Sequence, residues 1–210
     1  MNALDYLRRL EGLDPHASLL TPAGTRLLLF TGQSSFRSAR LEPDQSSFLR
    51  TIAPAGATIV DAGFPFHPAM LSDAPVPGIV AASWRNLLQA FWSVASPRYQ
   101  RCVARTLQQA LDATAKELLL VTGSCGLQLV NRAWPGLTIP AGLGIRIVAL
   151  GPACFGRLRL APAEVTVVQG TRDGWSRIFF HGPIDVRVPC GHLDAWTSPA
   201  VRARIAALLR

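Results

Sequence analysis

The sequence KELLLVTGSCGLQLVNRAW, residues 116–134, decides the fold of this chain. It contains a continuous apolar run at 118–121, of the kind shown by a strand that is buried on both faces. The run gives way to the small and polar residues TGSCG at 122–126, and an apolar pattern with helical spacing follows. We therefore expect a buried strand that turns sharply into a helix.

The spacing within TGSCG indicates which residue occupies the apex of this turn. A nucleophile at such an apex needs small residues two positions before and two positions after it, because strand and helix approach closely there. With Ser124 at the apex, these positions are Thr122 and Gly126. With Cys125 there, Leu127 would crowd the turn. The pattern favours Ser124 and keeps Cys125 as an alternative, while an ordinary strand-to-helix loop also remains open.

The composition is that of a compact globular protein. The 210 residues suffice for one sizeable core, and 49% of them are hydrophobic while 16% are charged. The formal net charge of +8 comes almost entirely from arginine, and the arginines are scattered, which is not typical of a nucleic-acid-binding surface. A basic surface can still attract an acidic partner or an anionic substrate. We expect a single α/β domain over 1–210 and no nucleic-acid partner.

The spacing of the cysteines and the residues near the N-terminus indicate the cellular compartment. The four cysteines are far apart and form no C-x-x-C motif, so we expect no metal, no disulfide framework and no cofactor. Charged residues at positions 5, 8 and 9 stand where a signal peptide needs an apolar centre. No apolar run reaches the length of a membrane span. These features predict a cytoplasmic protein without a membrane span.

Helix-like and strand-like stretches alternate through the second half of the chain, which is typical of parallel strands joined by right-handed crossovers. Further strands are expected at 57–61, 144–150, 163–170 and 184–188, and helices at 2–12, 41–53, 79–94, 98–116 and 200–209. At the start, two strand-like runs at 17–21 and 25–30 flank a Pro-Ala-Gly turn signal and predict an antiparallel hairpin. The whole pattern predicts a mostly parallel twisted sheet with helices on both faces.

The segment 64–97 differs from its surroundings. Several prolines up to residue 77 interrupt regular structure, and the helix-compatible stretch that follows is rich in large apolar side chains. Ordinary core packing explains such a helix. A small cap whose apolar side lines an acyl pocket explains it too, and both interpretations stay open here.

Three polar residues fall at or just after the carboxyl ends of three of the expected strands. They are Ser124, Asp173 and His192. Functional sites in open α/β sheets form at that edge. The order serine, aspartate, histidine is the one expected for a serine-nucleophile triad on such a topology.

With these motifs in place, residues 17–210 resemble the α/β-hydrolase superfamily. LLLVTGSCG (118–126) resembles its strand and nucleophile turn, and VVQGTRD (167–173) resembles its strand that ends at the acid. VPCGHLDAWTSPAVRARIAALL (188–209) resembles its closing Gly-His loop and last helix. LLLFTGQSS (27–35) resembles its oxyanion loop, although Thr31 replaces the usual histidine.

The resemblance implies a role for each residue. Ser124 would be the nucleophile, His192 the general base and later the acid, and Asp173 the group that holds the imidazole tautomer. The backbone N–H groups of Gln33 and Cys125 would receive the oxyanion. The implied activity is hydrolysis of an acyl ester or acyl thioester through an acyl-enzyme intermediate that water resolves.

The chain also departs from the family pattern. The connection from Asp173 to His192 is short, the usual lid after residue 150 is almost absent, and Cys125 beside Ser124 is an alternative nucleophile. The positive charge and the apolar segment 64–97 favour a long or polyketide-like acyl chain, which an acidic acyl carrier protein could present. The alternative from another class is a non-catalytic ligand-binding protein on the same fold.

Overall fold

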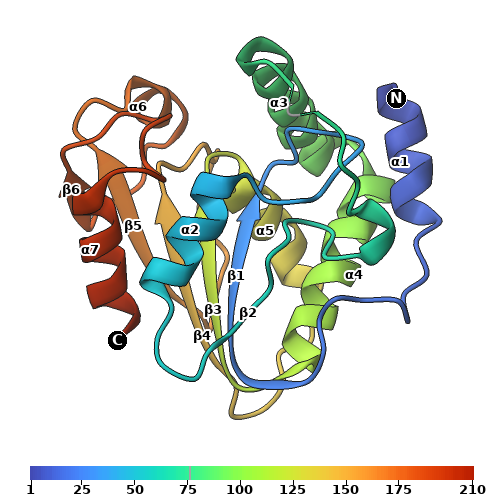
Figure 1. Ribbon diagram of the computed structural model, residues 1–210, viewed down its shortest axis with the longest axis horizontal. Coiled ribbons are helices and arrows are strands. Elements are labelled where there is room, and N and C mark those ends of the chain that lie inside the picture. Colours follow the sequence, from blue (N-terminus) through green and yellow to red (C-terminus); the bar gives the residue numbers. More distant parts are fainter. Residues whose placement is uncertain (76) are drawn as a thin grey trace.

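The computed structural model of the protein describes residues 1–75 and 77–210, so Val76 of the proline-rich stretch lies outside the described residues. Its centre is a six-stranded sheet in the order β2-β1-β3-β4-β5-β6, in which every neighbouring pair is parallel (Figure 1). The strands are β1 (Ala23–Thr31), β2 (Thr58–Ile59), β3 (Thr114–Gly123), β4 (Gly144–Leu150), β5 (Glu164–Gly170) and β6 (Val186–Val188). The predicted parallel α/β sheet is confirmed.

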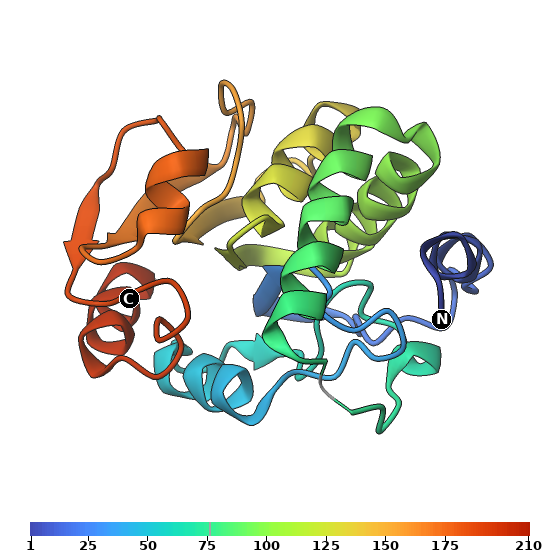
Figure 2. The same cartoon turned by 90° about the horizontal axis from the view of Figure 1, so that it is seen from above.

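Helices cover both faces of this sheet (Figures 1 and 2). On one face lie α2 (Pro43–Ile52) and α7 (Pro199–Leu209). On the other lie α4 (Pro97–Asp112) and α5 (Gly126–Ala133), with α1 (Ala3–Glu11) packed on α4. Beyond the carboxyl edge of the strands stand α3 (Ile79–Ala95) and the short α6 (Gly174–Phe179).

Alternating side chains of β1 divide the core in two. Leu27 and Leu29 pack on the side of α2 and α7, where Phe48 meets them, whereas Leu28 and Phe30 pack on the side of α4 and α5. All five side chains are fully buried. Successive side chains of a strand point to opposite faces, so a strand that is covered on both sides must be apolar without interruption. This explains why β1 and β3 read as continuous apolar runs in the sequence.

The predicted N-terminal hairpin is wrong. Residues 17–21 form no strand, and β1 itself begins within the proposed turn, at Ala23. The backbone N–H of Leu19 donates to the carbonyl of Phe66 at 2.9 Å, so the first run is tied to a distant loop and not to β1. The buried guanidinium of Arg26 donates to the carbonyl of Thr21 and to Thr114 Oγ1, which fixes residue 21 against the start of β3. Tertiary contacts therefore outweigh the local turn signal.

Smaller differences concern element bounds. The helix expected at 98–116 ends at Asp112, because β3 starts four residues before its apolar run, and the strand expected at 57–61 is only Thr58–Ile59. The helix expected at 79–94 is present as α3. Within the described residues, every helix is too short or too polar to cross a lipid bilayer.

Candidate active site

The residue at the end of β3 has a strained backbone. Ser124 has φ of 50°, in the left-handed region that residues other than glycine seldom adopt, at a cost of about 1–3 kcal/mol. Two hydrogen bonds hold it there: its N–H donates to the carbonyl of Leu150 at 3.3 Å, and its carbonyl accepts from the N–H of Ala153 at 2.9 Å. A side chain at Gly126 would collide with the carbonyl oxygen of Phe30. The small residue expected two positions after the apex is thus required by the close approach of α5 to β1.

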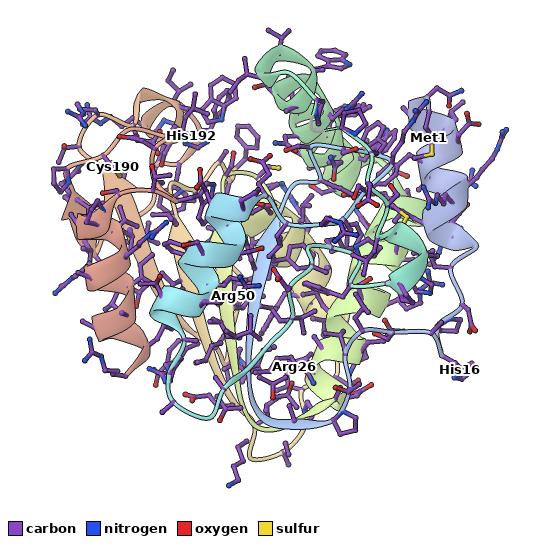
Figure 3. All side chains as sticks on the ribbon, viewed as in Figure 1. Met1, His16, Arg26, Arg50, Cys190 and His192 are labelled. Atoms are coloured by element: carbon purple, nitrogen blue, oxygen red, sulfur yellow. The ribbon has the colours of Figure 1, made fainter. Side chains whose placement is uncertain are left out.

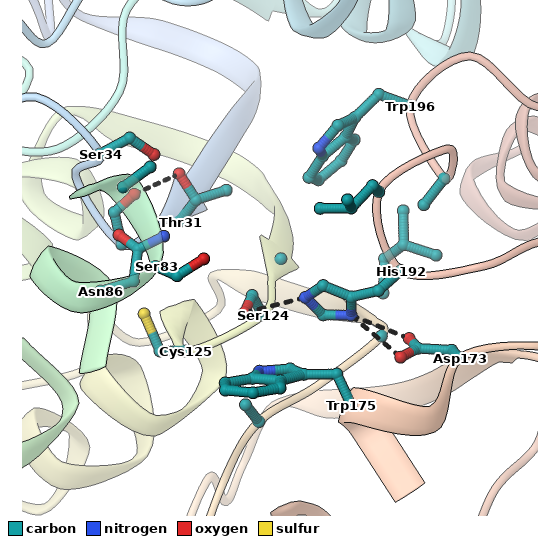
Figure 4. A pocket seen from close by; sticks show the side chains of 18 of the residues that line it. Thr31, Ser34, Ser83, Asn86, Ser124, Cys125, Asp173, Trp175, His192 and Trp196 are labelled. Atoms are coloured by element: carbon teal, nitrogen blue, oxygen red, sulfur yellow. Dashed lines mark hydrogen bonds and ion pairs between the residues drawn. The ribbon is translucent and has the colours of Figure 1, made fainter. Parts of the chain in front are cut away.

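The sheet brings the three predicted polar residues together. Ser124 follows β3, Asp173 follows β5 and caps α6, and His192 follows β6. His192 Nε2 lies 3.2 Å from Ser124 Oγ, and His192 Nδ1 lies 3.0 Å from each carboxylate oxygen of Asp173 (Figure 4). Figure 3 shows His192 at the carboxyl edge of the sheet, far from Arg26 near the opposite edge. Parallel strands deliver their ends to one edge, which is why residues remote in sequence meet here.

Burial and capping fix the orientation of this chain of hydrogen bonds. Asp173 is 1% exposed, and its Oδ1 also accepts from the backbone N–H of Ser176 at 2.9 Å. An ionised carboxylate can only accept, so its contact with Nδ1 requires the ring proton on that nitrogen. The lone pair of His192 Nε2 then faces the hydroxyl of Ser124. This arrangement can remove a proton from that hydroxyl.

The cysteine next to Ser124 has a different environment. Cys125 is 3% exposed, and burial raises the pKa of its thiol to about 12. Its sulfur packs against Gly32 and points away from His192, as Figure 4 shows. A reactive thiol needs a lowered pKa and a nearby base. The geometry therefore favours Ser124 over Cys125 as the nucleophile.

One backbone group named for the oxyanion is already engaged. The N–H of Gln33 donates to Gln89 Oε1 at 3.0 Å, and the carbonyl of Gln33 accepts from Gln89 Nε2 at 2.9 Å. The side-chain amide of α3 thus pairs with the backbone of the loop after β1. Gln33 could receive an oxyanion only if Gln89 turned away. The backbone N–H groups of Gly32 and Cys125 instead both interact with the Cys125 sulfur, which partly offsets the rise of its pKa.

A buried polar chain supports this loop. Tyr6 Oη donates to Gln33 Oε1, and Tyr99 Oη donates to Gln89 Oε1 at 3.0 Å. Burial raises the pKa of both tyrosines well above the ordinary value, so both remain donors. Sequence reasoning missed Gln89, because an amide among several polar residues of a mainly apolar helix carries no motif. Its only signal was its polarity within the stretch 79–94.

A pocket of about 620 Å³ opens above Ser124, within the size range of small-molecule sites. Apolar side chains line two opposite banks. Ile79, Ala82 and Leu87 line it from α3, and Phe155, Trp175, Phe179 and Leu193 line it from the other side. Ser83 and Asn86 of α3 and Glu42 and Gln45 at the start of α2 are among its polar groups. Within the described part of the chain, no group of His, Cys, Asp and Glu side chains is arranged to hold a metal ion.

Comparison with known proteins gives structural likeness only. No family model matches the chain, and no curated protein matches it in sequence. A dienelactone hydrolase-like promiscuous phosphotriesterase from metagenomic libraries matches with a TM-score of 0.53 and 14% identity, over 90% of this chain and 85% of that one. A carboxylesterase from Mesorhizobium loti matches with a TM-score of 0.46 and 19% identity, over 91% and 90% of the two chains. The first match, together with the sheet described above, shows that this chain has the α/β-hydrolase fold.

Proposed function

We propose that the protein is a hydrolase that cleaves an acyl ester or acyl thioester, with Ser124 as nucleophile, His192 as base and Asp173 as the residue that orients the imidazole. One observation carries the proposal: a continuous line of contacts runs from Ser124 Oγ through the ring of His192 to the carboxylate of Asp173 beside a largely apolar pocket. A structural role alone does not require a strained serine whose hydroxyl faces an imidazole.

The proposed reaction has two halves. In the first, Ser124 Oγ attacks the acyl carbonyl while His192 Nε2 takes the hydroxyl proton, and the buried carboxylate of Asp173 stabilises the imidazolium. The tetrahedral intermediate expels the alcohol or thiol, which leaves with the proton from Nε2, and an acyl-enzyme remains. In the second half, water gives a proton to Nε2, attacks the acyl group and releases the acid. Ser124 then regains its proton.

The oxyanion needs donors beside Ser124 Oγ. We propose the backbone N–H of Cys125, the first residue of the turn after the nucleophile, together with that of Gly32. Gly32 lies directly against Cys125, since a side chain added at Gly32 would collide with the Cys125 sulfur, and this proximity supports the pair. Gln33 would take part only after losing its bond to Gln89.

The substrate class follows from the pocket. Its lining favours an acyl chain with substantial apolar surface, and the overall positive charge suits delivery by an acidic acyl carrier protein as well as a free ester.

In this proposal the chain 1–210 acts as one α/β domain, and segment 64–97, through α3, serves as a small cap over the pocket. The proposed setting is cytoplasmic, which agrees with four free thiols. The structural match to a dienelactone hydrolase-like phosphotriesterase agrees with ester chemistry.

Covalent labelling tests the proposal directly. Wild-type protein should react with a fluorophosphonate probe, and mass mapping should place the adduct on Ser124. The variant Ser124→Ala should neither react nor hydrolyse p-nitrophenyl esters or acyl thioesters, whereas Cys125→Ala should do both. An adduct on Cys125 would move the nucleophile by one residue. No adduct at either residue, combined with tight binding of an apolar ligand, would favour the non-catalytic binding protein.

A further inference from the structure

Exposed apolar side chains gather around the mouth of the pocket. Eleven large hydrophobic residues are exposed among those that the structure describes, and ten of them lie on α3 or on the opposite bank of the pocket. We call these ten the apolar rim. On α3 they are Ile79, Val80, Trp84, Leu87, Phe91 and Val94, and on the opposite bank they are Phe155, Trp175, Ile178 and Leu193. The eleventh, Leu4, belongs to α1.

The α3 part of the rim is a stripe along one side of the helix. Val80, Trp84, Leu87, Phe91 and Val94 are spaced by three or four residues, which places them on one side of a helix. Val80 is 81% exposed and Trp84 65%, so these side chains do not pack into the core. In Figure 1 this helix projects above the sheet, with the α6 bank across from it. Scattered exposed hydrophobics need no explanation, but a stripe of them along a helix whose neighbouring side lines a pocket indicates an interaction surface.

Basic side chains outnumber acidic ones beside the rim. Arg85 follows Trp84 on α3, while the acidic side chains nearby include Asp194, next to Leu193, and Glu42, which lines the pocket. On the bank opposite α3, the exposed Arg157, Arg172 and Arg177 lie within a few residues of Phe155 and Trp175. Arg172 makes only a long, exposed contact of 3.7 Å with Asp194. An anionic surface would therefore be attracted to the basic surroundings of the rim.

We propose that the apolar rim docks this protein on an anionic lipid surface, with the mouth of the pocket turned toward the lipid. Aromatic and aliphatic side chains with basic neighbours are the combination that binds a bilayer interface without spanning it. A second copy seated on the same rim would close the mouth from which Ser124 is reached. An acidic protein could pair with the arginines beside the rim, but its charged side chains would find no partner along the apolar stripe of α3.

This geometry also narrows the substrate, a step that rests on the proposed function. A mouth that faces lipid receives an ester or thioester dissolved in that lipid layer, without passage through water. Cytoplasmic leaflets carry a negative surface potential, which agrees with the proposed setting. Docking itself requires no catalysis, so the two proposals can fail separately.

The experiment uses full-length Ser124→Ala protein, which keeps the surface and lacks the proposed nucleophile. Flotation is measured with vesicles of phosphatidylcholine alone and with vesicles of phosphatidylcholine and phosphatidylglycerol in equal amounts. We expect binding to the mixed vesicles, weakened by added salt. Adding Trp84→Asp and Phe91→Asp should lower the partition coefficient by about tenfold or more. Adding Ala203→Asp and Ala207→Asp on exposed positions of α7 gives the same change in net charge and should leave binding within about twofold.

The remaining outcomes contradict either docking or the proposed function. Absence of binding to the mixed vesicles overturns it, and so does binding that the substitutions on α3 leave unchanged. A dimer in light scattering that the α3 substitutions dissociate assigns the rim to a second copy. Binding of purified acyl carrier protein, without vesicle binding, assigns it to that partner. Wild-type protein that binds vesicles but hydrolyses no ester contradicts the proposed function alone, and hydrolysis of soluble esters without vesicle binding contradicts docking alone.

Discussion

A methyl group added at the Cα of Gly151 would lie 2.6 Å from Asp173 Oδ2, closer than side-chain carbons approach such oxygens. The same methyl group would lie 3.3 Å from His192 Nδ1. Gly151 has φ of 53°, and its N–H donates to the carbonyl of Val168 at 2.8 Å, so it cannot easily move away. The first residue after β4 thus limits the space in which the acid and the imidazole meet.

Gly151→Ala should consequently damage the site as well as the fold. The positive φ by itself costs about 1 kcal/mol for alanine, and the clash with Asp173 adds about 1–3 kcal/mol. We expect the free energy of unfolding in urea to fall by this sum. We also expect kcat/KM for ester hydrolysis to fall more than tenfold, which corresponds to a rise of more than about 1.4 kcal/mol in the activation free energy. Gly142→Ala is the matched control, because Gly142 has φ of 79° and open space around it. Equal losses in both variants would contradict this packing argument.

Ser124 and Cys125 should respond very differently to alanine. Ser124→Ala removes the proposed nucleophile, and we expect kcat to fall by about 10⁴-fold or more. Cys125→Ala removes a buried thiol that faces Gly32 and has no contact with His192, so kcat should change less than about tenfold while stability falls by about 1 kcal/mol. Steady-state kinetics and urea unfolding of both variants measure this. The reverse order of effects would favour the thiol.

Asp173→Asn should lower kcat by about 10⁴-fold while leaving KM within a few fold. The amide NH2 can donate to His192 Nδ1 and leave the ring proton on Nε2, so the imidazole cannot take the proton of Ser124. Asp194→Asn is its control. That carboxylate lies two residues after His192 but accepts from the N–H of Gly191 at 2.6 Å and does not contact the ring. We expect its kcat to stay within about tenfold of wild type. Comparable losses in both variants would assign the effect to the loop and not to the imidazole.

Gln89→Leu should separate catalysis from stability. The substitution leaves the backbone N–H and carbonyl of Gln33 without partners in the core, and each lost bond should cost about 1–3 kcal/mol of stability. It should also loosen the loop that carries Gly32. We expect kcat to fall more than KM rises. Trp134→Phe is the control. It removes the hydrogen bond of 2.9 Å that Trp134 Nε1 donates to the carbonyl of Ala161, at the end of α5 that lies away from Ser124. It should lower stability without changing kcat, and an equal loss of kcat in both would show that Gln89 acts through stability alone.

Cys125 should resist alkylation in the folded protein. Burial raises the pKa of its thiol to about 12, so the reactive thiolate is scarcer than for an ordinary cysteine at every pH below that value. Near pH 8 only about one thiol in 10⁴ would be ionised, even if the reagent reached it. Iodoacetamide followed by peptide mass analysis should find Cys125 unmodified in native protein and modified after unfolding in urea. Rapid native labelling with loss of activity would contradict this environment.

Much of the fold could be predicted because burial leaves a periodic trace. The apolar runs of β1, β3 and β4 and the alternation of helices and strands are properties of the sequence that a sheet covered on both faces requires. The hairpin failed because a Pro-Ala-Gly stretch is a local signal, and the buried guanidinium of Arg26 ties residue 21 elsewhere. Gln89 was missed for a related reason: its partner is the backbone of Gln33, and backbone groups leave no trace in a sequence.

By itself, the sequence determined that a strand ends at a small-residue turn carrying Ser124, and that an acid and a histidine follow later strands, because these features depend on residue type and spacing. Only the tertiary structure decided that His192 faces Ser124 and not Cys125, that Gln33 is held by Gln89, and that exposed apolar side chains surround the pocket mouth. The physical reason is directional: hydrogen bonds and exposure depend on where side chains point in three dimensions, and spacing along the chain fixes only which element carries them.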